Sequence, residues 1–305
     1  MIKKILIFVL TCSLFLVCAK AKEKKKYLAL GDSITAGYLL DNPEEESFAS
    51  IFAKEYDFEL TNEAVSGDKS GVLLEKLANY NIDNYDVITL CIGANDVLRD
   101  FIDKFEELDP AELALFIGNV KENEEFNKKI DQNLEVLDKN LEQIMNILKK
   151  GHAQIYMMNI YNPYRYNTIS SMSDIADYYM TKINKVVEKY AKEVNFVNIY
   201  KTFAKTKNKI INSQDIKTIY DPHPNVEGHK LIAKTISESY YKNNPESINV
   251  ILAIVLGVAV VILEVVEVIY TIKKFVVKPI IKDNDRPNIE EKDNNMSNSS
   301  RFIRS

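Results

Sequence analysis

The sequence predicts an α/β fold, a parallel five-stranded sheet with helices on both faces, followed by a C-terminal transmembrane helix. Two patterns predict the sheet: short apolar runs alternate with helix patterns between residues 22 and 247, and five of these runs have the length of strands. A long apolar segment near the C-terminus predicts the membrane helix. A content of 46% hydrophobic and 27% charged residues in a chain of 305 agrees with one or two globular domains.

The predicted strands are residues 27–30, 58–65, 87–92, 153–160 and 194–200. The clearest helix pattern covers residues 122–150, where apolar residues repeat every three or four positions until Gly151. Asp109 and Pro110 predict an N-cap and a first-turn proline for another helix, which starts at Ala111. The apolar face of the long helix would also suit a coiled-coil partner, but we favour packing on the chain's own sheet.

Residues 1–21 have the three parts of an export signal: two lysines, an apolar run over residues 5–17, and a small-residue end at Ala19-Lys20-Ala21. We predict a signal peptide that is cleaved after Ala21. Two alternatives remain open. The chain could be a lipoprotein acylated at Cys18, or the apolar run could stay uncleaved as a signal anchor.

Residues 248–272 form the apolar segment near the other end, long enough to cross a hydrocarbon layer of ~30 Å as a helix. Glu264 and Glu267 favour the alternative of a buried soluble helix, but both lie in its last third, where they can reach toward the following lysines. Positive charges are denser after the segment (Lys273, Lys274, Lys278, Lys282 and Arg286) than before it (Lys234 and Lys242). The polar tail, residues 273–305, is therefore predicted in the cytoplasm and the body outside the cell.

Composition argues against several classes of partner and cofactor. The net charge is -5 and the body has no dense basic block, so we expect no nucleic-acid partner. Of three cysteines, only Cys91 lies in the body, which rules out an internal disulfide or a cysteine metal cage there. Its apolar strand predicts that Cys91 is buried and inert. No metal or nucleotide motif occurs, so no metal and no cofactor are expected.

Polar residues follow three predicted strands at the edge where open α/β sheets build their sites. Ser33 follows the first strand in Gly31-Asp32-Ser33, Gly67 follows the second, and Asn95 follows the third in Gly93-Ala94-Asn95-Asp96. A hydroxyl, a backbone N–H that a ligand can approach, and a carboxamide would suit acyl transfer. Each motif alone also fits a turn or a helix cap.

Asp221-Pro222-His223-Pro224 stands before the last helix of the body. A residue before proline is pushed toward extended geometry, so Asp221 and His223 should point to one side with Cα atoms ~6.6 Å apart. A carboxylate could then hold the imidazole; the alternative is a histidine in a solvent loop. Together with the three strand-end motifs, this pair supplies a nucleophile, a base, an orienting acid and oxyanion donors.

On these residues the sequence resembles the SGNH hydrolases, the GDSL esterase and lipase superfamily, whose four blocks supply Ser, Gly, Asn and His in that order. Ser33, Gly67, Asn95 and His223 match the blocks, and the resemblance covers about residues 26–241. It implies a flavodoxin-like three-layer sandwich. It also implies that Ser33 is the nucleophile, His223 the base and Asp221 its orienting acid. The N–H groups of Ser33 and Gly67 and the Asn95 side chain would form the oxyanion hole.

One spacing departs from the family pattern, which usually places the acid three residues before the histidine. Here Asp221 stands two residues before His223, so Asp215 or a main-chain carbonyl remains an alternative partner for the ring. His152 and His229 are more simply explained as local structural residues.

An aromatic cluster follows the fourth predicted strand. Tyr161, Tyr164 and Tyr166 would line an acyl or sugar pocket, or pack within their own loop.

The predicted protein is an exported, membrane-tethered serine ester hydrolase acting on lipid, glycan O-acyl or small esters. Its predicted parts are a signal peptide at residues 1–21, a hydrolase domain at 22–247, a transmembrane helix at 248–272 and a cytoplasmic tail at 273–305. An O-acyltransferase that uses the same acyl-enzyme is one alternative. A non-catalytic surface binding module is another, because fold alone does not settle function.

Overall fold

The structure is a computed structural model, and it describes residues 23–282 apart from 168, 169 and 219. The predicted signal peptide at residues 1–21 lies outside the described residues. So does the predicted tail from residue 283 onward.

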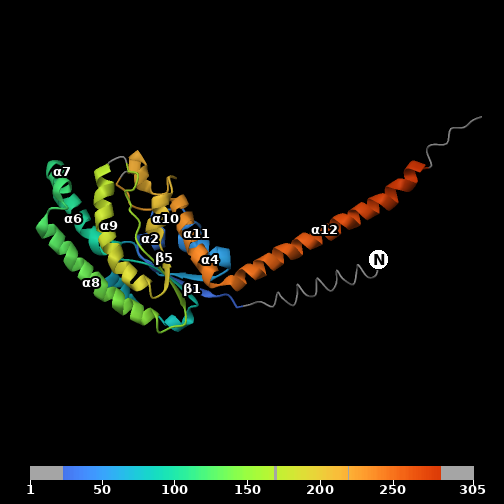
Figure 1. Ribbon diagram of the computed structural model, residues 1–305, viewed down its shortest axis with the longest axis horizontal. Helices are drawn as coiled ribbons and strands as arrows, with labels where there is room; N and C mark the ends of the chain where they lie inside the picture. The colour runs from blue at the N-terminus through green and yellow to red at the C-terminus, as the bar shows by residue number, and fades with distance from the viewer. Residues whose placement is uncertain (1–22, 168–169, 219, 283–305) are drawn as a thin grey trace, which may run out of the picture. The chain divides into compact units, whose positions relative to one another are not determined.

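A single parallel sheet organises the first part of the chain, with strand order β2-β1-β3-β4-β5 (Figure 1). The strands are β1 (Lys26–Gly31), β2 (Glu59–Asn62), β3 (Val87–Cys91), β4 (Gln154–Met158) and β5 (Asn195–Val197). Every residue of β3 is buried, as expected for a central strand covered on both faces. The predicted five-stranded parallel sheet is confirmed.

Helices cover both faces of this sheet and give three layers. The helices that precede the last one are α2 (Ser33–Ala36), α3 (Pro43–Glu46), α4 (Phe48–Tyr56), α5 (Ser70–Leu77), α6 (Ala94–Glu107), α7 (Pro110–Asn119), α8 (Glu124–Leu148), α9 (Ser170–Ala191), α10 (Ile199–Lys205) and α11 (Val226–Asn243). Helices α5, α6, α8 and α9 pack together on one face, whereas α3, α4, α10 and α11 pack together on the other (Figure 1).

Two strands, β2 and β5, end three residues earlier than the sequence predicts, and in both cases an asparagine stands where the strand ends. The Asn62 side chain accepts a hydrogen bond from the Ala64 N–H, which turns the chain and ends β2 three residues before Val65. The Asn198 side chain accepts from the Lys201 N–H and caps α10. Tyr200 therefore lies in a helix and not in β5.

The two helices predicted between β3 and β4 are present. Helix α7 starts at Pro110, and Asp109 and Glu112 form a reciprocal capping box. Helix α8 buries Ile130, Leu137 and Leu141 completely, so its apolar stripe packs in the core of its own unit. The coiled-coil alternative is therefore wrong.

The core brings the ends of the central strands together at one edge of the sheet. In the register of β1 and β3, Gly31 pairs with Cys91, so the chain leaves both strands side by side. The Tyr27 hydroxyl and Thr89 Oγ1 lie 2.7 Å apart between these strands, and both residues are fully buried. The loops that follow β1 and β3 thus start from a rigid, fully packed base.

The chain divides into two compact units, one ending at Asn243 and the other beginning at Asn244. The described part of the second unit is α12 (Pro245–Lys282). Within it, Val255–Lys273 is 19 residues long with a mean hydropathy of 2.4, and none of it is buried, so it is long and apolar enough to cross a membrane.

Candidate active site

Ser33 is held in a tight turn between β1 and α2. The Asp32 side chain caps α2 by accepting a hydrogen bond from the Ile34 N–H at 3.1 Å, which makes Ser33 the first helical residue. A Cβ atom on Gly31 would lie well inside contact distance of the Thr35 side chain and the Cys91 carbonyl. Only glycine lets the backbone at residue 31 approach Thr35 and Cys91 this closely as the chain turns from β1 into α2.

His223 lies in a loop that several hydrogen bonds fix in place. The Asn212 N–H donates to the His223 carbonyl at 2.9 Å, next to a bridge between Ile211 and Pro224. The Tyr161 hydroxyl, three residues after the end of β4, donates to the Pro222 carbonyl at 2.7 Å. The loop is therefore tied both to its own neighbouring segment and to the sheet.

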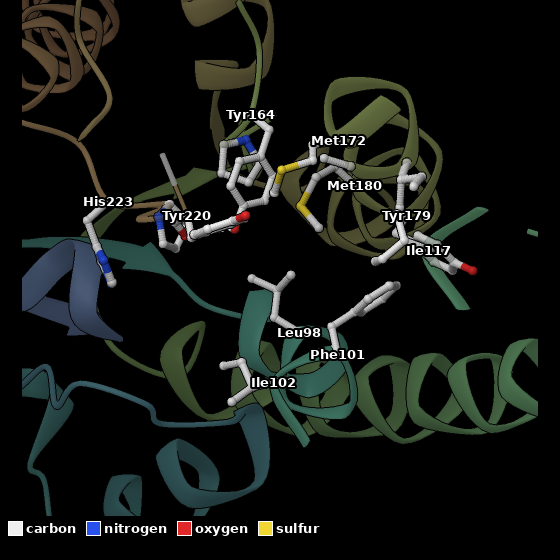
Figure 2. A pocket seen from close by; sticks show the side chains of 14 residues that line it. Leu98, Phe101, Ile102, Ile117, Tyr164, Met172, Tyr179, Met180, Tyr220 and His223 are labelled. Atoms are coloured by element: carbon white, nitrogen blue, oxygen red, sulfur yellow. Dashed lines mark hydrogen bonds between the residues drawn. The ribbon is translucent and has the colours of Figure 1, made fainter. Parts of the chain in front are cut away.

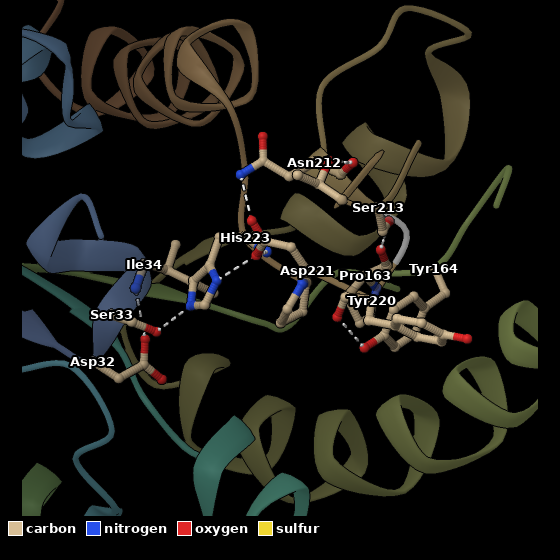
Figure 3. Close-up of polar contacts among 12 residues, drawn as sticks. Asp32, Ser33, Ile34, Pro163, Tyr164, Asn212, Ser213, Tyr220, Asp221 and His223 are labelled. Carbon is tan, nitrogen blue, oxygen red and sulfur yellow. Dashed lines mark hydrogen bonds and ion pairs between the residues drawn. The ribbon is translucent and has the colours of Figure 1, made fainter. Parts of the chain in front are cut away.

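Ser33, His223 and Asp221 form one continuous line of polar contacts (Figure 3). Ser33 Oγ lies 3.0 Å from His223 Nε2. His223 Nδ1 lies 2.7 Å from Asp221 Oδ1, and both side chains are 17% exposed. The structure thus brings together the three residues that the sequence predicts as nucleophile, base and acid.

The short Asp-x-His spacing is accommodated because Asp221 also accepts the His223 backbone N–H at 2.9 Å. Its other oxygen accepts from the Asn212 side chain at 2.8 Å. Partial burial raises the pKa of Asp221, but the hydrogen bonds from His223 and Asn212 outweigh it and hold the pKa below its ordinary value. Asp221 stays ionised, whereas Asp215 is exposed and accepts from the Lys217 N–H.

Gly67 and Asn95 stand at the ends of the two strands that flank β1. Gly67 has φ of 85°, in the left-handed region that favours glycine, and a Cβ atom at this position would have no other atom within 4 Å. One N–H of the Asn95 carboxamide donates to the Asp68 carbonyl at 3.1 Å, and a carboxamide carries a second N–H. Helix α6 is capped by Gly93, so Asn95 is not the helix cap that its position also suggested.

Asp96 links the Asn95 loop to the Gly67 loop through hydrogen bonds with Ser70. Its carboxylate accepts the Ser70 N–H at 3.0 Å and the Ser70 hydroxyl at 2.5 Å, and Asn140 donates to that hydroxyl at 2.9 Å. Burial raises the pKa of Asp96, partly opposed by its bonds from Ser70. The link ties the start of α6 to the start of α5, which positions the Asn95 and Gly67 loops relative to each other.

Asp32 is a second acid, next to Ser33 in the chain, and its surroundings differ from those of Asp221. Burial raises the pKa of Asp32 to about 7, partly opposed by its hydrogen bond from Ile34 and by nearby His223. Asp32 Oδ2 is buried without a hydrogen-bond partner among the described residues. This orphaned oxygen explains why the charged form is disfavoured.

The other residues singled out from the sequence lie away from this line of contacts. His152 is exposed and its Nε2 lies 3.6 Å from Asp86. His229 is fully buried in α11, where its Nδ1 accepts the Phe48 N–H at 3.2 Å. Cys91 is buried, and burial raises the pKa of its thiol well above the ordinary value, as predicted for an inert cysteine.

The three tyrosines after β4 have different surroundings. Tyr161 is buried and stacks on Phe203 with ring centroids 4.4 Å apart. Tyr164 lines a cavity beside His223. Tyr166 is exposed and donates its hydroxyl to the Ala204 carbonyl at 3.1 Å. The cluster therefore contributes one residue to loop packing, one to a pocket and one to the surface.

Two contacts of the site could not be found from sequence patterns. Tyr38, just after α2, lies with its ring centroid 4.9 Å from that of His223. Asn212, which holds Asp221, begins a single 3₁₀ turn (η2, Asn212–Gln214) that no sequence motif marks. Across the described residues, no group of three or more His, Cys, Asp or Glu side chains has the arrangement needed to hold a metal ion.

Residues 27–236 match the family model of the GDSL-like lipase/acylhydrolases. The chain belongs to this family. It is also 26% identical over 237 residues to the uncharacterized protein YpmR of Bacillus subtilis (strain 168), covering 73% of this chain and 84% of that protein. An arylesterase of Vibrio mimicus is 27% identical over 159 residues, covering 50% of this chain and 62% of the arylesterase.

Solved structures share the fold. The extracellular lipase of Streptomyces rimosus has a TM-score of 0.56 at 20% identity, covering 70% of this chain and 99% of the lipase. Phospholipase A1 of Streptomyces albidoflavus NA297 has a TM-score of 0.54 at 14% identity, covering 71% of this chain and 99% of that enzyme. The GDSL-like protein described here is thus an α/β ester hydrolase, as its family membership establishes.

Proposed function

We propose that this GDSL-like hydrolase cleaves esters through a covalent acyl-enzyme, with Ser33 as nucleophile, His223 as general base and acid, and Asp221 orienting His223. One observation carries the proposal: Ser33 Oγ lies 3.0 Å from His223 Nε2, and His223 Nδ1 lies 2.7 Å from Asp221 Oδ1. Both separations fall within hydrogen-bond reach of about 2.6 to 3.2 Å, so Ser33 can pass its proton to His223 while Asp221 holds the ring.

The chemistry proceeds in two halves. Ser33 Oγ attacks the ester carbonyl carbon while its proton passes to His223 Nε2; the tetrahedral intermediate then expels the alcohol, which takes that proton from His223. His223 next removes a proton from water, which attacks the acyl-enzyme, and the same proton returns to Ser33 as the acid leaves. Asp221 remains ionised and stabilises the imidazolium in each half.

The oxyanion of each tetrahedral intermediate needs hydrogen-bond donors. We assign this role to the backbone N–H groups of Ser33 and Gly67 and to the second N–H of the Asn95 side chain. The positive φ of Gly67 and the Asn95 contact with Asp68 support the assignment, because they preset both donors before substrate arrives. Donors that need no reorganisation contribute most to lowering the barrier.

The direct test uses the full chain in nanodiscs of ether-linked lipid, which contains no competing ester. Wild-type protein should react with a fluorophosphonate probe and hydrolyse p-nitrophenyl butyrate, whereas Ser33→Ala should do neither at matched folding by circular dichroism. Labelling that persists in Ser33→Ala would identify a different nucleophile. A folded wild type that neither labels nor turns over would favour the binding-module alternative.

We further propose that the hydrolase domain lies outside the cell, with 1–21 as its export signal, 22–247 as the domain, 248–272 as the span and 273–305 in the cytoplasm. The apolar segment Val255–Lys273 supports the span. The excess of lysine and arginine after this segment supports the orientation.

A further inference from the structure

A cavity of about 550 Å³ opens beside His223, within the first compact unit (Figure 2). Its walls come from α6, α7, α9 and the loops that hold Tyr164 and Tyr220. Figure 2 shows His223 at one end, whereas Phe101, Ile117 and Tyr179 lie at the opposite end. The cavity is therefore elongated, and only one of its ends meets the proposed base.

The lining of this cavity is almost entirely hydrocarbon, aromatic ring and thioether. It includes Leu98, Phe101, Ile102, Met172, Ile175 and Met180. Apart from His223, no lining residue has an ionisable group other than a tyrosine hydroxyl. Such a wall stabilises apolar surface and offers few partners to a polar or charged group.

Two of the three tyrosine hydroxyls in this wall, those of Tyr164 and Tyr179, already have partners within the protein, and the third tyrosine, Tyr220, is 64% exposed. The Tyr164 hydroxyl donates to the Tyr220 carbonyl at 2.9 Å. The Tyr179 hydroxyl is 3.2 Å from the Val120 carbonyl and 3.0 Å from Asn127 Oδ1. A sugar or a phosphate headgroup in the cavity would lose its hydrogen bonds to water and gain few in return, whereas a hydrocarbon chain would lose none.

We propose that this cavity binds the acyl chain of the substrate, so that the enzyme prefers esters of medium-length fatty acids over acetyl esters. The proposal rests on attack by Ser33, since the scissile carbonyl must lie at the His223 end. The acyl side is chosen because glycerol, glycerophosphate and sugar alcohols are polar, so the hydrocarbon of their esters lies in the acyl group. A volume of about 550 Å³ lies within the usual range for ligand pockets and is large enough to hold a chain of octanoyl or decanoyl size.

The far end of the cavity is firm enough to limit chain length. Phe101 packs edge to face on Phe126 and on Tyr179, with ring centroids 4.9 Å and 4.8 Å apart. Phe116 of α7 extends the same cluster to Phe126, at 5.0 Å. Aromatic rings packed in this way resist displacement. Ile117 follows Phe116 on α7 and lines the far end of the cavity, so it acts as the stop for the acyl chain.

The first measurement compares kcat/KM for p-nitrophenyl acetate, butyrate, hexanoate, octanoate and decanoate, using the full chain in nanodiscs of ether-linked lipid. Because the leaving group is constant, only acyl binding changes across the series. We expect kcat/KM to rise by about two- to fourfold for each added methylene group until the chain reaches the far end. A maximum at acetate would overturn the proposal.

Two substitutions on α7 then test the stop. Ile117→Phe should lower kcat/KM for octanoate and decanoate by about tenfold or more and leave butyrate within about twofold. The matched control is Leu115→Phe, which adds the same ring to a position on the same helix that is 68% exposed and should leave the whole profile unchanged. If Ile117→Phe fails to fold, Ile117→Ala should shift the optimum toward longer chains.

The outcomes separate this inference from the proposed function. Fluorophosphonate labelling together with an unchanged chain-length profile in a folded Ile117 variant would overturn the acyl cavity and leave the serine mechanism standing. An absence of labelling and of turnover on every ester would overturn the mechanism itself. Methyl, butyl and octyl acetate provide the remaining comparison: a strong preference for the octyl alcohol would assign the cavity to the alcohol side and overturn the proposal.

Discussion

Asp221 holds the His223 ring through one carboxylate oxygen, while Asn212 holds the other oxygen. Asp221→Ala removes both contacts and leaves the ring free to rotate and to take the wrong tautomer. We expect kcat to fall by about 10³- to 10⁴-fold, less than for Ser33→Ala, because the nucleophile and base remain. Steady-state kinetics with p-nitrophenyl butyrate measure the loss.

Asp215→Ala is the matched control for this substitution. Asp215 is exposed and bonds to the Lys217 N–H, so its removal should change kcat by less than about twofold. Equal losses in the two variants would show that Asp221 is not the orienting acid.

His229 makes the stability of the fold depend on pH. Burial, with a smaller effect of His223, lowers the pKa of His229 from 6.5 to about 4. Between these values the unfolded chain binds a proton that the folded chain does not, so stability is full above pH 6.5 and falls as the pH drops toward 4. At about 1.4 kcal/mol per pKa unit, the loss is roughly 3 kcal/mol.

His229→Asn tests this dependence, because the asparagine oxygen can still accept the Phe48 N–H and the side chain does not titrate. We expect the variant to lose less stability than wild type between pH 7 and pH 4.5, measured by urea unfolding with circular dichroism. Acid effects of other carboxylates occur in both proteins and cancel in the comparison. Parallel losses in the two proteins would refute the assignment.

The sequence predicted the positions of Ser33, Gly67 and Asn95 because each follows a strand, and parallel strands end at one edge. It also predicted that Asp221 would lie beside His223, since the flanking prolines limit the backbone. Asn212 could not be predicted, because its place depends on how a single 3₁₀ turn packs against the loop that holds His223. Loop geometry of this kind leaves no periodic signal in the sequence.

At the scale of elements, the turn from β1 into α2 depends on the size of Gly31. Gly31→Ala would press a methyl group on Thr35 and the Cys91 carbonyl, and so would push β1 and β3 apart where Ser33 is held. We expect a loss of roughly 1–3 kcal/mol or more in the free energy of unfolding, together with reduced activity. Urea titration and ester turnover measure the two effects.

Gly118→Ala in α7 is the control, because the same substitution is made there at an uncrowded position. No atom lies within 4 Å of its Cβ position, and alanine favours the helix, so stability should stay the same or rise by up to about 1 kcal/mol. A comparable loss in both glycine variants would mean that crowding is not the cause at Gly31.

Element types were predicted well because alternation and helical periodicity follow from burial on one face. The ends of β2 and β5 were not predicted correctly, because side-chain hydrogen bonds of Asn62 and Asn198 end these strands inside apolar runs. Of the cavity beside His223, the sequence suggested only Tyr164 as a lining residue, since the other walls come from helices whose packing is set by the whole core.

At the scale of the whole molecule, the division at Asn243 predicts that the hydrolase unit works without its apolar helix. A chain ending at Asn243 should remain soluble after alkaline carbonate extraction and keep kcat/KM for p-nitrophenyl butyrate within about threefold of the full chain. The full chain should stay in the membrane pellet, because Val255–Lys273 is apolar and exposed. A full chain found in the supernatant would contradict the membrane assignment.

Orientation in the membrane is a separate prediction. In intact cells, an added protease should digest an epitope placed in the α3 region and spare one placed after Ser305, because the basic residues favour a cytoplasmic tail. Permeabilised cells provide the control, since both epitopes should then be digested. The reverse pattern in intact cells would place the hydrolase in the cytoplasm.

Ser33 and His223 touch across 190 positions of the chain, which sets when activity arises during biosynthesis. At about 5–20 residues per second, the ribosome adds the segment between them in roughly 10–40 s. Under the proposed mechanism, the nascent chain has the Ser33 hydroxyl without the His223 imidazole through that interval, so it cannot form an acyl-enzyme on an ester. The loop with His223 and then α11 are made last in this unit, just before α12. Under that mechanism, hydrolysis can start only after His223 has been made, close to the point at which synthesis reaches α12, which holds the proposed span.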